Sequence, residues 1–451
     1  MRKIAGIVKE SSPEAIVTAA ARLDPHLLAK SWLAANNHFL AHSAAKVDAR
    51  MEGRNKDRAV ALSPGSVHGM QLAEFVAASV VLHCADGWAY LGRAMGAQLG
   101  GDTGASGHLS YYAELRAAMS LLASQGIGVF NQNHVIVHSN GKVDVFRQQG
   151  THRFVWDALE AWSASDRSSA VVTSMVRPAG ASLGQWYAAF TSGAKAKFKG
   201  DEYLRLWGLD IQRFAQDQSA RGEASYRPRT ATGCKPPASA RAAEFGAALW
   251  RALEPDGNAP FGIVDLHLLR RTLEVAFRER TQKKPVNDPD LYLEYIQHAI
   301  DELPLSVPSS RLEPFLKREV DPADIEILTA AENMAEMDDP EHHLHMLARA
   351  ALLLRLSTGC AKELIENASL DYESFEWWSD QLASARALVV PGELPAEPAE
   401  LWEDVEQALI DLNEELSEGA GTDYATLHQR CSRQLGLLGG CERIALIGLA
   451  A

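Results

Sequence analysis

The 451-residue sequence is poor in cysteine and has no long uninterrupted apolar run, and each absence excludes a class of protein. The five cysteines include no Cys-x-x-Cys pair, which argues against a disulfide framework and a structural zinc site. The most apolar stretch, Ser79 to Leu99, is interrupted by His83, Asp86 and Arg93, so no membrane-spanning helix is predicted. No apolar run follows the basic first residues, so we expect no secretory signal and a cytoplasmic protein with reduced cysteines.

The sequence also lacks the glycine-rich loops that hold nucleotide phosphates. Neither G-x-x-x-x-G-K-[ST] nor G-x-G-x-x-G occurs, so neither an ATPase nor a dinucleotide enzyme is predicted, and no cofactor is expected. A G-x-S-x-G match at 180–184 would make Ser182 a hydrolase nucleophile, with 170–176 as the strand before it. Because Pro178 intervenes and no strand–helix series surrounds the match, a serine hydrolase is only the third hypothesis.

Two histidines near the middle of the second half share one helix face. His342 and His345 have a spacing that could hold a metal ion, but no third ligand is visible nearby. We therefore interpret them as the solvated start of a helix and predict no metal site.

Positive and negative charges are divided unequally along the chain. Residues 1–250 contain 27 Lys and Arg against 20 Asp and Glu, a net charge of +7. Residues 251–451 contain 17 against 38, a net charge of −21. A basic surface attracts phosphate and an acidic one repels it, so any RNA-binding function belongs to the first half. The acidic half suits a basic protein partner, the chain's own basic surface, or solubility alone.

Periodic apolar residues predict helices over most of the chain. Leucines three and four residues apart mark the stretches 266–277, 344–354 and 401–412. The segment 221–240 instead is rich in Pro, Gly, Ser and Thr and carries several basic residues, so we predict a linker there. The chain then divides into a helical domain at 1–220, a basic linker at 221–240 and an acidic helical domain at 241–451.

One β-hairpin is predicted in this otherwise helical chain, at about 133–147. Alternating β-branched residues flank Asn140-Gly141, a pair suited to a two-residue type I′ turn. That turn would place His134 opposite Arg147 and on the same face of the hairpin. Val135, Val137 and Phe146 would then form the opposite face and pack against helices. The predicted fold class is therefore mainly α, a helical bundle with one inserted hairpin followed by a second helical domain.

Helices with recognisable sequences flank this hairpin. The stretch 108–126 reads HLSYYAELRAAMSLLASQG, with an apolar stripe and a glycine that favours a helix end at Gly126. The stretch 150–162 reads GTHRFVWDALEAW, with Thr151 suited to an N-cap. Together with the hairpin, they resemble the HEPN superfamily of helical domains, over roughly residues 70–163. That superfamily is common in prokaryotic toxin–antitoxin, CRISPR-associated and anti-phage systems.

The resemblance implies a ribonuclease that needs no metal. Active members of the superfamily carry an Arg-x(4–6)-His motif, which Arg147 and His152 match in this chain. Imidazole can move protons near neutral pH, and guanidinium can stabilise charge on a phosphate. His134 would supply a second imidazole from the facing strand. Further candidates for RNA contact are Arg153, Arg116, Tyr111, Arg227 and Arg229.

Each of these residues also has a purely structural interpretation. His152 could be an ordinary helix-start histidine, and Tyr111 suits core packing better than base stacking. Many HEPN-like domains are inactive and serve as dimerisation or binding modules, so the chain could form a homodimer. The first hypothesis is a defence or toxin ribonuclease with Arg147 and His152 at the phosphate. The second is a non-catalytic helical scaffold that binds protein partners through its acidic half.

Overall fold

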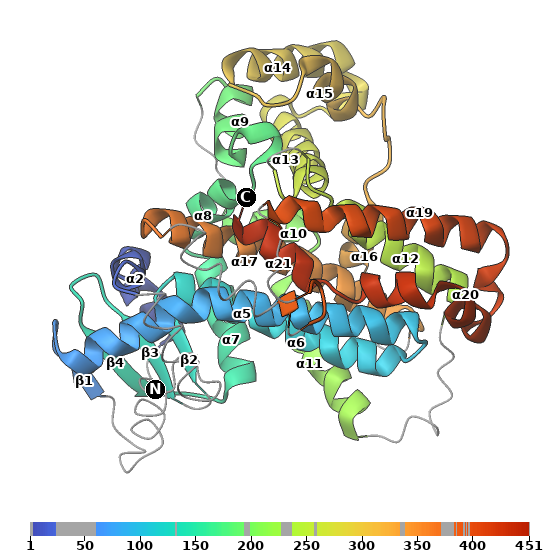
Figure 1. Cartoon of the computed structure of the whole chain (residues 1–451). Coiled ribbons are helices and arrows are strands. Elements are labelled where there is room, and N and C mark those ends of the chain that lie inside the picture. Colours follow the sequence, from blue (N-terminus) through green and yellow to red (C-terminus); the bar gives the residue numbers. More distant parts are fainter. Residues whose placement is uncertain are drawn as a thin grey trace.

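The computed structural model describes most of the chain, namely residues 3–23, 60–130, 133–193, 199–226, 237–256, 259–333, 339–370, 383–384, 386–390, 393, 395 and 397–450. Within them the chain is mainly helical and contains one small antiparallel sheet, which confirms the predicted fold class. Figure 1 shows long helices through the centre, the sheet at the lower left and a group of helices above.

Three long helices form the centre of the molecule: α5 (Val67–Leu99), α6 (Thr103–Ser124) and α17 (His342–Asn367). α17 packs against both of the others, and the periodic stretch 344–354 lies within it as predicted. α5 and α17 approach closely at Gly87, where an added Cβ would lie 2.5 Å from a Leu354 methyl carbon. Trp88 on α5 donates a hydrogen bond to the Thr358 hydroxyl of α17 at 2.9 Å, which fixes this crossing.

α5 is long and apolar enough, by length and composition, to cross a membrane. However, 72% of its most apolar window is buried inside the protein. α2 (Pro13–Ala20), α6, α17, α20 (Tyr424–Leu438) and α21 (Glu442–Ala450) all contact it. α5 is therefore a core helix that other helices of the chain cover.

The two halves of the chain share one hydrophobic core. One continuous cluster of buried apolar residues runs from the first helices to the last. The predicted linker is also partly helical, because α11 (Ile211–Tyr226) extends into it and α12 (Ser239–Ala252) begins before it ends. Residues 227–236 lie outside the described part of the chain. The predicted boundary at 220–240 therefore does not separate two cores.

The sheet has four antiparallel strands in the order β1-β4-β3-β2. Their bounds are β1 (Val60–Leu62), β2 (Ile127–Phe130), β3 (Asn133–Val137) and β4 (Val143–Arg147). β3 and β4 form the predicted hairpin, whereas β1 and β2 were not expected from the sequence. α6 ends just before Gly126, whose φ of +85° lets the chain turn directly into β2. The loop after β4 leads into α7 (Thr151–Ser163).

The predicted register of the hairpin is wrong by one residue. His134 pairs with Phe146, and Arg147 pairs with Asn133. The reason is a three-residue loop at 139–141, closed by a hydrogen bond from His138 N to Lys142 O at 2.9 Å. Gly141 takes the left-handed conformation, with φ +75°, that ends such a loop. A one-residue shift exchanges the faces of a strand, so His134 and Arg147 lie on opposite faces.

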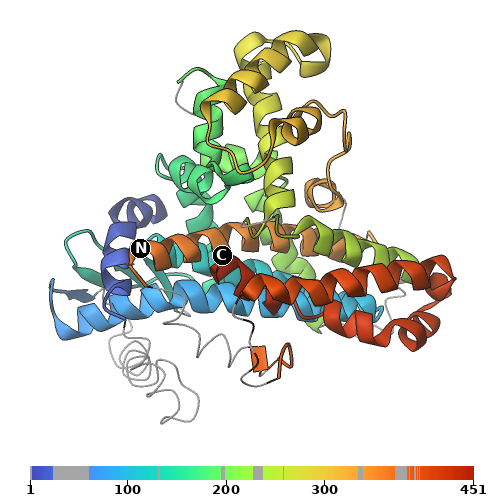
Figure 2. The ribbon, with the colours of Figure 1, turned by 45° about the horizontal axis from the view of Figure 1, so that its top comes forward.

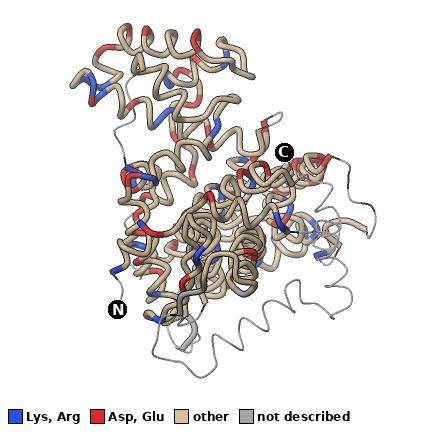
Figure 3. The backbone as a smooth tube through the Cα atoms, turned by 90° about the vertical axis from the view of Figure 1, so that its left-hand side faces the viewer, with Lys and Arg blue, Asp and Glu red and all other residues tan. Residues whose placement is uncertain are grey.

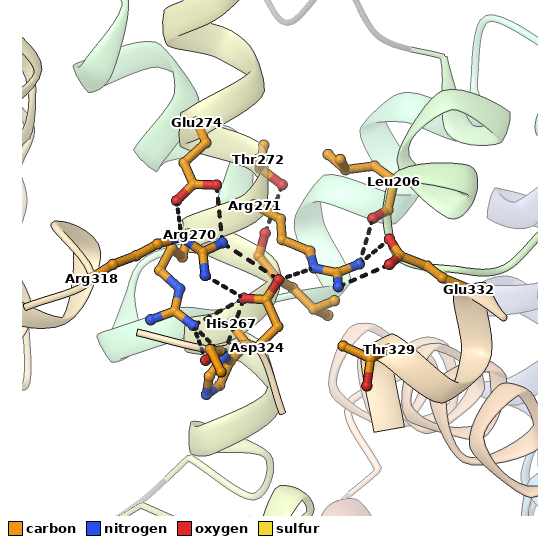
Figure 4. A network of polar contacts seen from close by, with 12 residues as sticks. Leu206, His267, Arg270, Arg271, Thr272, Glu274, Arg318, Asp324, Thr329 and Glu332 are labelled. Carbon is orange, nitrogen blue, oxygen red and sulfur yellow. Dashed lines mark hydrogen bonds and ion pairs between the residues drawn. The ribbon is translucent and has the colours of Figure 1, made fainter. Parts of the chain in front are cut away.

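A group of shorter helices stands above the long ones in Figures 1 and 2. They are α8 (Ser168–Met175), α9 (Leu183–Phe190), α10 (Gly200–Leu206), α13 (Gly262–Thr281), α14 (Pro289–Glu302) and α15 (Ser309–Leu316). α16 (Glu326–Glu332) packs against α17 and α12. Figure 4 shows an ion network that ties the segment after α15 to α13. At its centre, the Asp324 carboxylate accepts hydrogen bonds from Arg270 and Arg271, each at 2.9 Å. These pairs fasten an irregular segment to a buried helix.

Acidic and basic groups of the two halves also pair with each other. Arg241 of α12 binds Glu341 at 3.0 Å, and Arg349 of α17 binds Asp217 of α11 at 2.8 Å. Figure 3 shows residues of both signs along much of the chain. By contrast, α19 (Glu403–Ser417), which contains most of the periodic stretch 401–412, carries a row of exposed acidic side chains. Part of the negative charge therefore neutralises the chain's own bases and part faces solvent.

Candidate functional site

The most unusual polar cluster in the first half lies where α6, α7 and α11 meet. His152, in the first turn of α7, has both ring nitrogens in polar contacts. Its Nδ1 lies 2.8 Å from the Tyr111 hydroxyl of α6, and its Nε2 lies 3.3 Å from Arg221 Nη2 of α11. Three helices that are far apart in the sequence thus converge on one imidazole. Gly150 is the N-cap of α7, one residue earlier than the predicted Thr151.

These contacts fix the protonation pattern of His152. A guanidinium only donates hydrogen bonds, so Nε2 accepts from Arg221 and Nδ1 carries the hydrogen given to Tyr111. Partial burial, and then the nearby Arg221 charge, lower the pKa of His152 below its ordinary value. The imidazole is therefore neutral near pH 7, with the Nε2 lone pair turned toward the guanidinium.

Aromatic rings surround the Arg221 side chain. Its Nη2 donates to the Tyr112 hydroxyl at 3.1 Å, and its guanidinium lies 5.5 Å from the Tyr112 ring centre and 5.8 Å from that of Tyr111. The Tyr112 ring also packs against His108, with 5.1 Å between ring centres. Four of these side chains are half-exposed, namely those of His108, Tyr112, His152 and Arg221. We call these four residues together with the buried Tyr111 the His152 cluster.

A buried ionic network holds α11 in place directly beside this cluster. Asp217, one turn before Arg221, accepts two hydrogen bonds from Arg349 Nη2 of α17, each at 2.8 Å. Glu114, one turn after Tyr111, has Oε1 3.7 Å from Arg349 Nε. Burial, and then the charge of Asp217, raise the pKa of Glu114 well above its usual range, so Glu114 is protonated. One guanidinium therefore balances one carboxylate, and the network fixes the turn that carries Arg221.

His134 is part of the core rather than of this cluster, which corrects its predicted catalytic role. Its ring is fully buried and stacks on Phe154 of α7, with centres 3.7 Å apart. Nε2 donates to the Gln149 carbonyl at 2.9 Å, and Nδ1 accepts from Phe130 N at 3.4 Å. Burial lowers the pKa of His134 to about 4. Both nitrogens are satisfied inside the protein, so this imidazole cannot reach an RNA.

Arg147 and Arg153 are both exposed, as residues that contact RNA must be. Arg147 is the last residue of β4, five residues before His152. Arg153 follows His152 on α7 and reaches Asp157 at 3.9 Å, with 77% of its side chain exposed. Their predicted contacts with phosphate stay predictions.

The other proposed RNA-binding residues are placed differently. Tyr111 is fully buried and contributes its hydroxyl to His152, so its ring offers no stacking surface, contrary to the prediction. Arg116 turns toward α5, where Nη1 lies 2.9 Å from His83 Nδ1 and Nε lies 3.8 Å from Asp86. Arg227 and Arg229 lie outside the described residues.

The hydrolase interpretation of Ser182 is wrong. The expected strand before it is the helix α8, and Ser182 is the N-cap of α9, accepting a hydrogen bond from Gln185 N at 3.2 Å.

His342 does begin α17, as predicted, with Nε2 3.4 Å from Asp217. His345, however, is buried and lies 3.1 Å from the Asn333 amide. It is therefore not solvated.

Sequence reasoning missed Arg221 and His108 as candidates for the site. Arg221 lies 69 residues from His152 and was placed in the linker, because the composition after it is typical of a loop. A signal existed in the spacing of Asp217 and Arg221, which puts an acid and a base on one helix face. The chain matches no protein-family model, no curated protein and no solved structure, so no relative supplies an assignment.

Proposed function

We propose that the protein is a metal-independent ribonuclease of a bacterial toxin or anti-phage defence system, with His152 and Arg221 at the scissile phosphate. The cytoplasm is the compartment in which such an enzyme meets its RNA. The observation that carries the proposal is a neutral, half-exposed imidazole held 3.3 Å from a guanidinium. These are the two groups that cleavage of RNA by its own 2′-hydroxyl requires without a metal.

The chemistry follows from the donor and acceptor pattern of the cluster. A bound phosphate would accept hydrogen bonds from Arg221 and so free the His152 Nε2 lone pair. That nitrogen takes the 2′-hydroxyl proton while the oxygen attacks phosphorus, giving a 2′,3′-cyclic phosphate. The leaving 5′-oxygen needs a proton, and His108, which like His152 packs against the Tyr112 ring, is the candidate acid. Tyr111 keeps the imidazole oriented through Nδ1.

A second version of the proposal places Arg147, instead of Arg221, at the scissile phosphate. The resemblance to HEPN proteins assigns the phosphate to Arg147, whereas the contacts of His152 favour Arg221. The two arginines lie on different elements, β4 and α11, so single substitutions can distinguish them.

The direct experiment is cleavage of single-stranded and structured RNA by the purified full-length protein in EDTA. We expect cleavage by the wild type and a loss of at least about 100-fold in His152→Ala, the usual contribution of a positioned acid–base group. Arg221→Ala should lose activity similarly if it holds the phosphate, and Arg147→Ala should then remain active. Activity that requires a metal, or full activity in His152→Ala, would contradict the proposal.

Two matched controls separate chemistry from folding. His298→Ala removes an exposed histidine of α14 and should change neither activity nor the melting temperature. Arg213→Ala removes an arginine of α11 two turns before Arg221 and should leave cleavage unchanged. Each variant is compared by thermal melting, so that a loss of activity in a folded protein is assigned to the site.

The exposed acidic face of α19 favours a second function, a scaffold that binds a basic partner. Five side chains on this face and just beyond it are exposed, namely Glu403, Asp404, Glu406, Glu414 and Glu418. Binding of the full chain to a Lys/Arg-rich peptide, measured at two salt concentrations, tests it. Replacing four of these five acidic side chains by neutral ones should weaken binding of the peptide. It should also make the binding less dependent on salt, because salt screens interactions between exposed charges. Equal binding by this variant and the wild type would exclude α19 as the docking face.

A further inference from the structure

Three side chains of the kinds that bind metal ions converge at the turn end of the hairpin. They are Glu10, the last residue of α1 (Ile4–Glu10), His138, directly after β3, and Asp144 of β4. One ligand atom from each lies within 4.8 Å of the other two. The backbone brings them together, because Ser12 N donates to Val137 O at 2.9 Å and so docks the end of α1 on β3.

The spacing of the atoms suits a small divalent ion. His138 Nε2 and Asp144 Oδ2 lie 3.1 Å apart. Two ligands about 2.1 Å from one tetrahedral zinc ion are separated by roughly 3.4 Å, so a small shift would accommodate the ion. An imidazole nitrogen with two carboxylates is a donor set that zinc accepts, and it is less suited to magnesium or calcium, which prefer oxygen alone.

A positive charge already lies beside the Asp144 carboxylate. The Lys142 ammonium lies 3.0 Å from Asp144 Oδ1, and the Asp144 side chain is only 4% exposed. A carboxylate so deeply buried needs a positive charge beside it. The Lys142 side chain is 36% exposed and can turn into solvent, so a dication could replace the ammonium without leaving a buried charge unbalanced.

We propose that Glu10, His138 and Asp144 bind one divalent transition-metal ion, best matched by Zn²⁺, with water completing the coordination. The ion would cross-link the end of α1 to the hairpin. The site shares no residue with the His152 cluster, so it is independent of the proposed ribonuclease chemistry. EDTA should then remove the ion and lower stability while leaving RNA cleavage intact.

Titration of chelator-treated, untagged full-length protein with ZnCl₂ by isothermal calorimetry tests the site. We expect saturable binding of one ion, and a melting temperature at least about 3 °C higher with zinc at 100 times its dissociation constant. Glu10→Gln, an exposed position that should not affect folding, and Asp144→Asn should each weaken binding at least about 10-fold. Lys142→Ala should bind zinc more tightly, because it removes the competing ammonium.

The control is another histidine with a neighbouring carboxylate. His298 and Glu302 of α14 lie 3.3 Å apart on an exposed helix face. His298→Ala should bind zinc like the wild type. The proposal is overturned if the wild type shows no saturable binding, if Glu10→Gln binds as tightly as the wild type, or if His298→Ala removes the bound ion.

Discussion

Burial of His134 as a neutral ring predicts a specific loss of stability in acid. The pKa of this imidazole is about 4 in the folded protein and about 6.5 in an unfolded chain. Between these values the unfolded chain binds more protons, so stability is full above about pH 6.5 and falls as the pH decreases toward 4. The physical cause is burial, which disfavours the charged ring and so lowers its pKa. In addition, Nδ1 accepts from Phe130 N, which a protonated ring cannot do.

The size of this effect follows from the two pKa values. At pH 5 an unfolded histidine with pKa 6.5 is almost fully protonated, whereas His134 is almost fully neutral. At 1.36 kcal/mol per pKa unit, the unfolded state gains about 2 kcal/mol between pH 7.5 and pH 5 from this single group. His345, whose pKa burial and the nearby Arg349 lower to about 4, contributes with the same sign.

Urea unfolding of the wild type and His134→Phe at pH 7.5 and pH 5 isolates the contribution of His134. The phenyl ring keeps the stack on Phe154 but cannot titrate. We expect the variant to be less stable at pH 7.5, because it lacks the hydrogen bond to Gln149, and to lose about 2 kcal/mol less than the wild type on acidification. An equal pH dependence in both proteins would refute the buried, neutral state of His134.

Three further predictions concern the core, the ion network and a helix cap. Phe146→Ala should lower the free energy of unfolding by about 3–5 kcal/mol, because the ring is 4% exposed and packs against His134 and Phe154. A decrease below about 1 kcal/mol, measured by urea unfolding, would mean that the ring does not contribute to the core. Asp324→Asn should cost about 3–5 kcal/mol, because it leaves the buried Arg270 charge without its carboxylate. The exposed pair of Arg205 and Asp201 is the control, and Asp201→Asn should cost less than about 1 kcal/mol in the same assay. Ser182→Ala should cost about 1 kcal/mol through loss of the α9 cap and leave RNA cleavage unchanged; a complete loss of activity would revive its role as a nucleophile.

Helix positions could be predicted well because local periodicity determines them. The stretch 266–277 lies within α13, 344–354 lies within α17, and the end of α6 before Gly126 follows from one glycine. The mainly α fold class follows from the same patterns. β1 and β2 could not be foreseen in this way, because each is short and finds its partner only through the folded sheet.

The hairpin register shows where local sequence becomes ambiguous. Asn140-Gly141 suits a two-residue turn, and it equally supplies the last two positions of a three-residue loop. Because the loop has three residues and not two, His134 lies in the core and not on the predicted RNA-facing side. Packing of the ring on Phe154 decides this outcome, and Phe154 lies on a different element.

Only part of the candidate site could be identified from the sequence. His152 and the tyrosines of 108–126 could be singled out from the flanking helices, but their partner Arg221 comes from a helix 69 residues away. Only the fold brings α11 beside α6 and α7, through the Asp217–Arg349 pair with α17. Long-range ion pairs of this kind leave no periodic signal in a single sequence.

The central claim is that His152 and Arg221 support cleavage of RNA by its own 2′-hydroxyl. The measurement that tests it most directly compares one RNA with the same strand methylated at every 2′-oxygen, both incubated with the full-length protein in EDTA. We predict that only the unmodified RNA is cut, and that its fragments carry 2′,3′-cyclic phosphate and 5′-hydroxyl ends. Cutting of the methylated strand, or fragments with 5′-phosphate ends, would contradict this account.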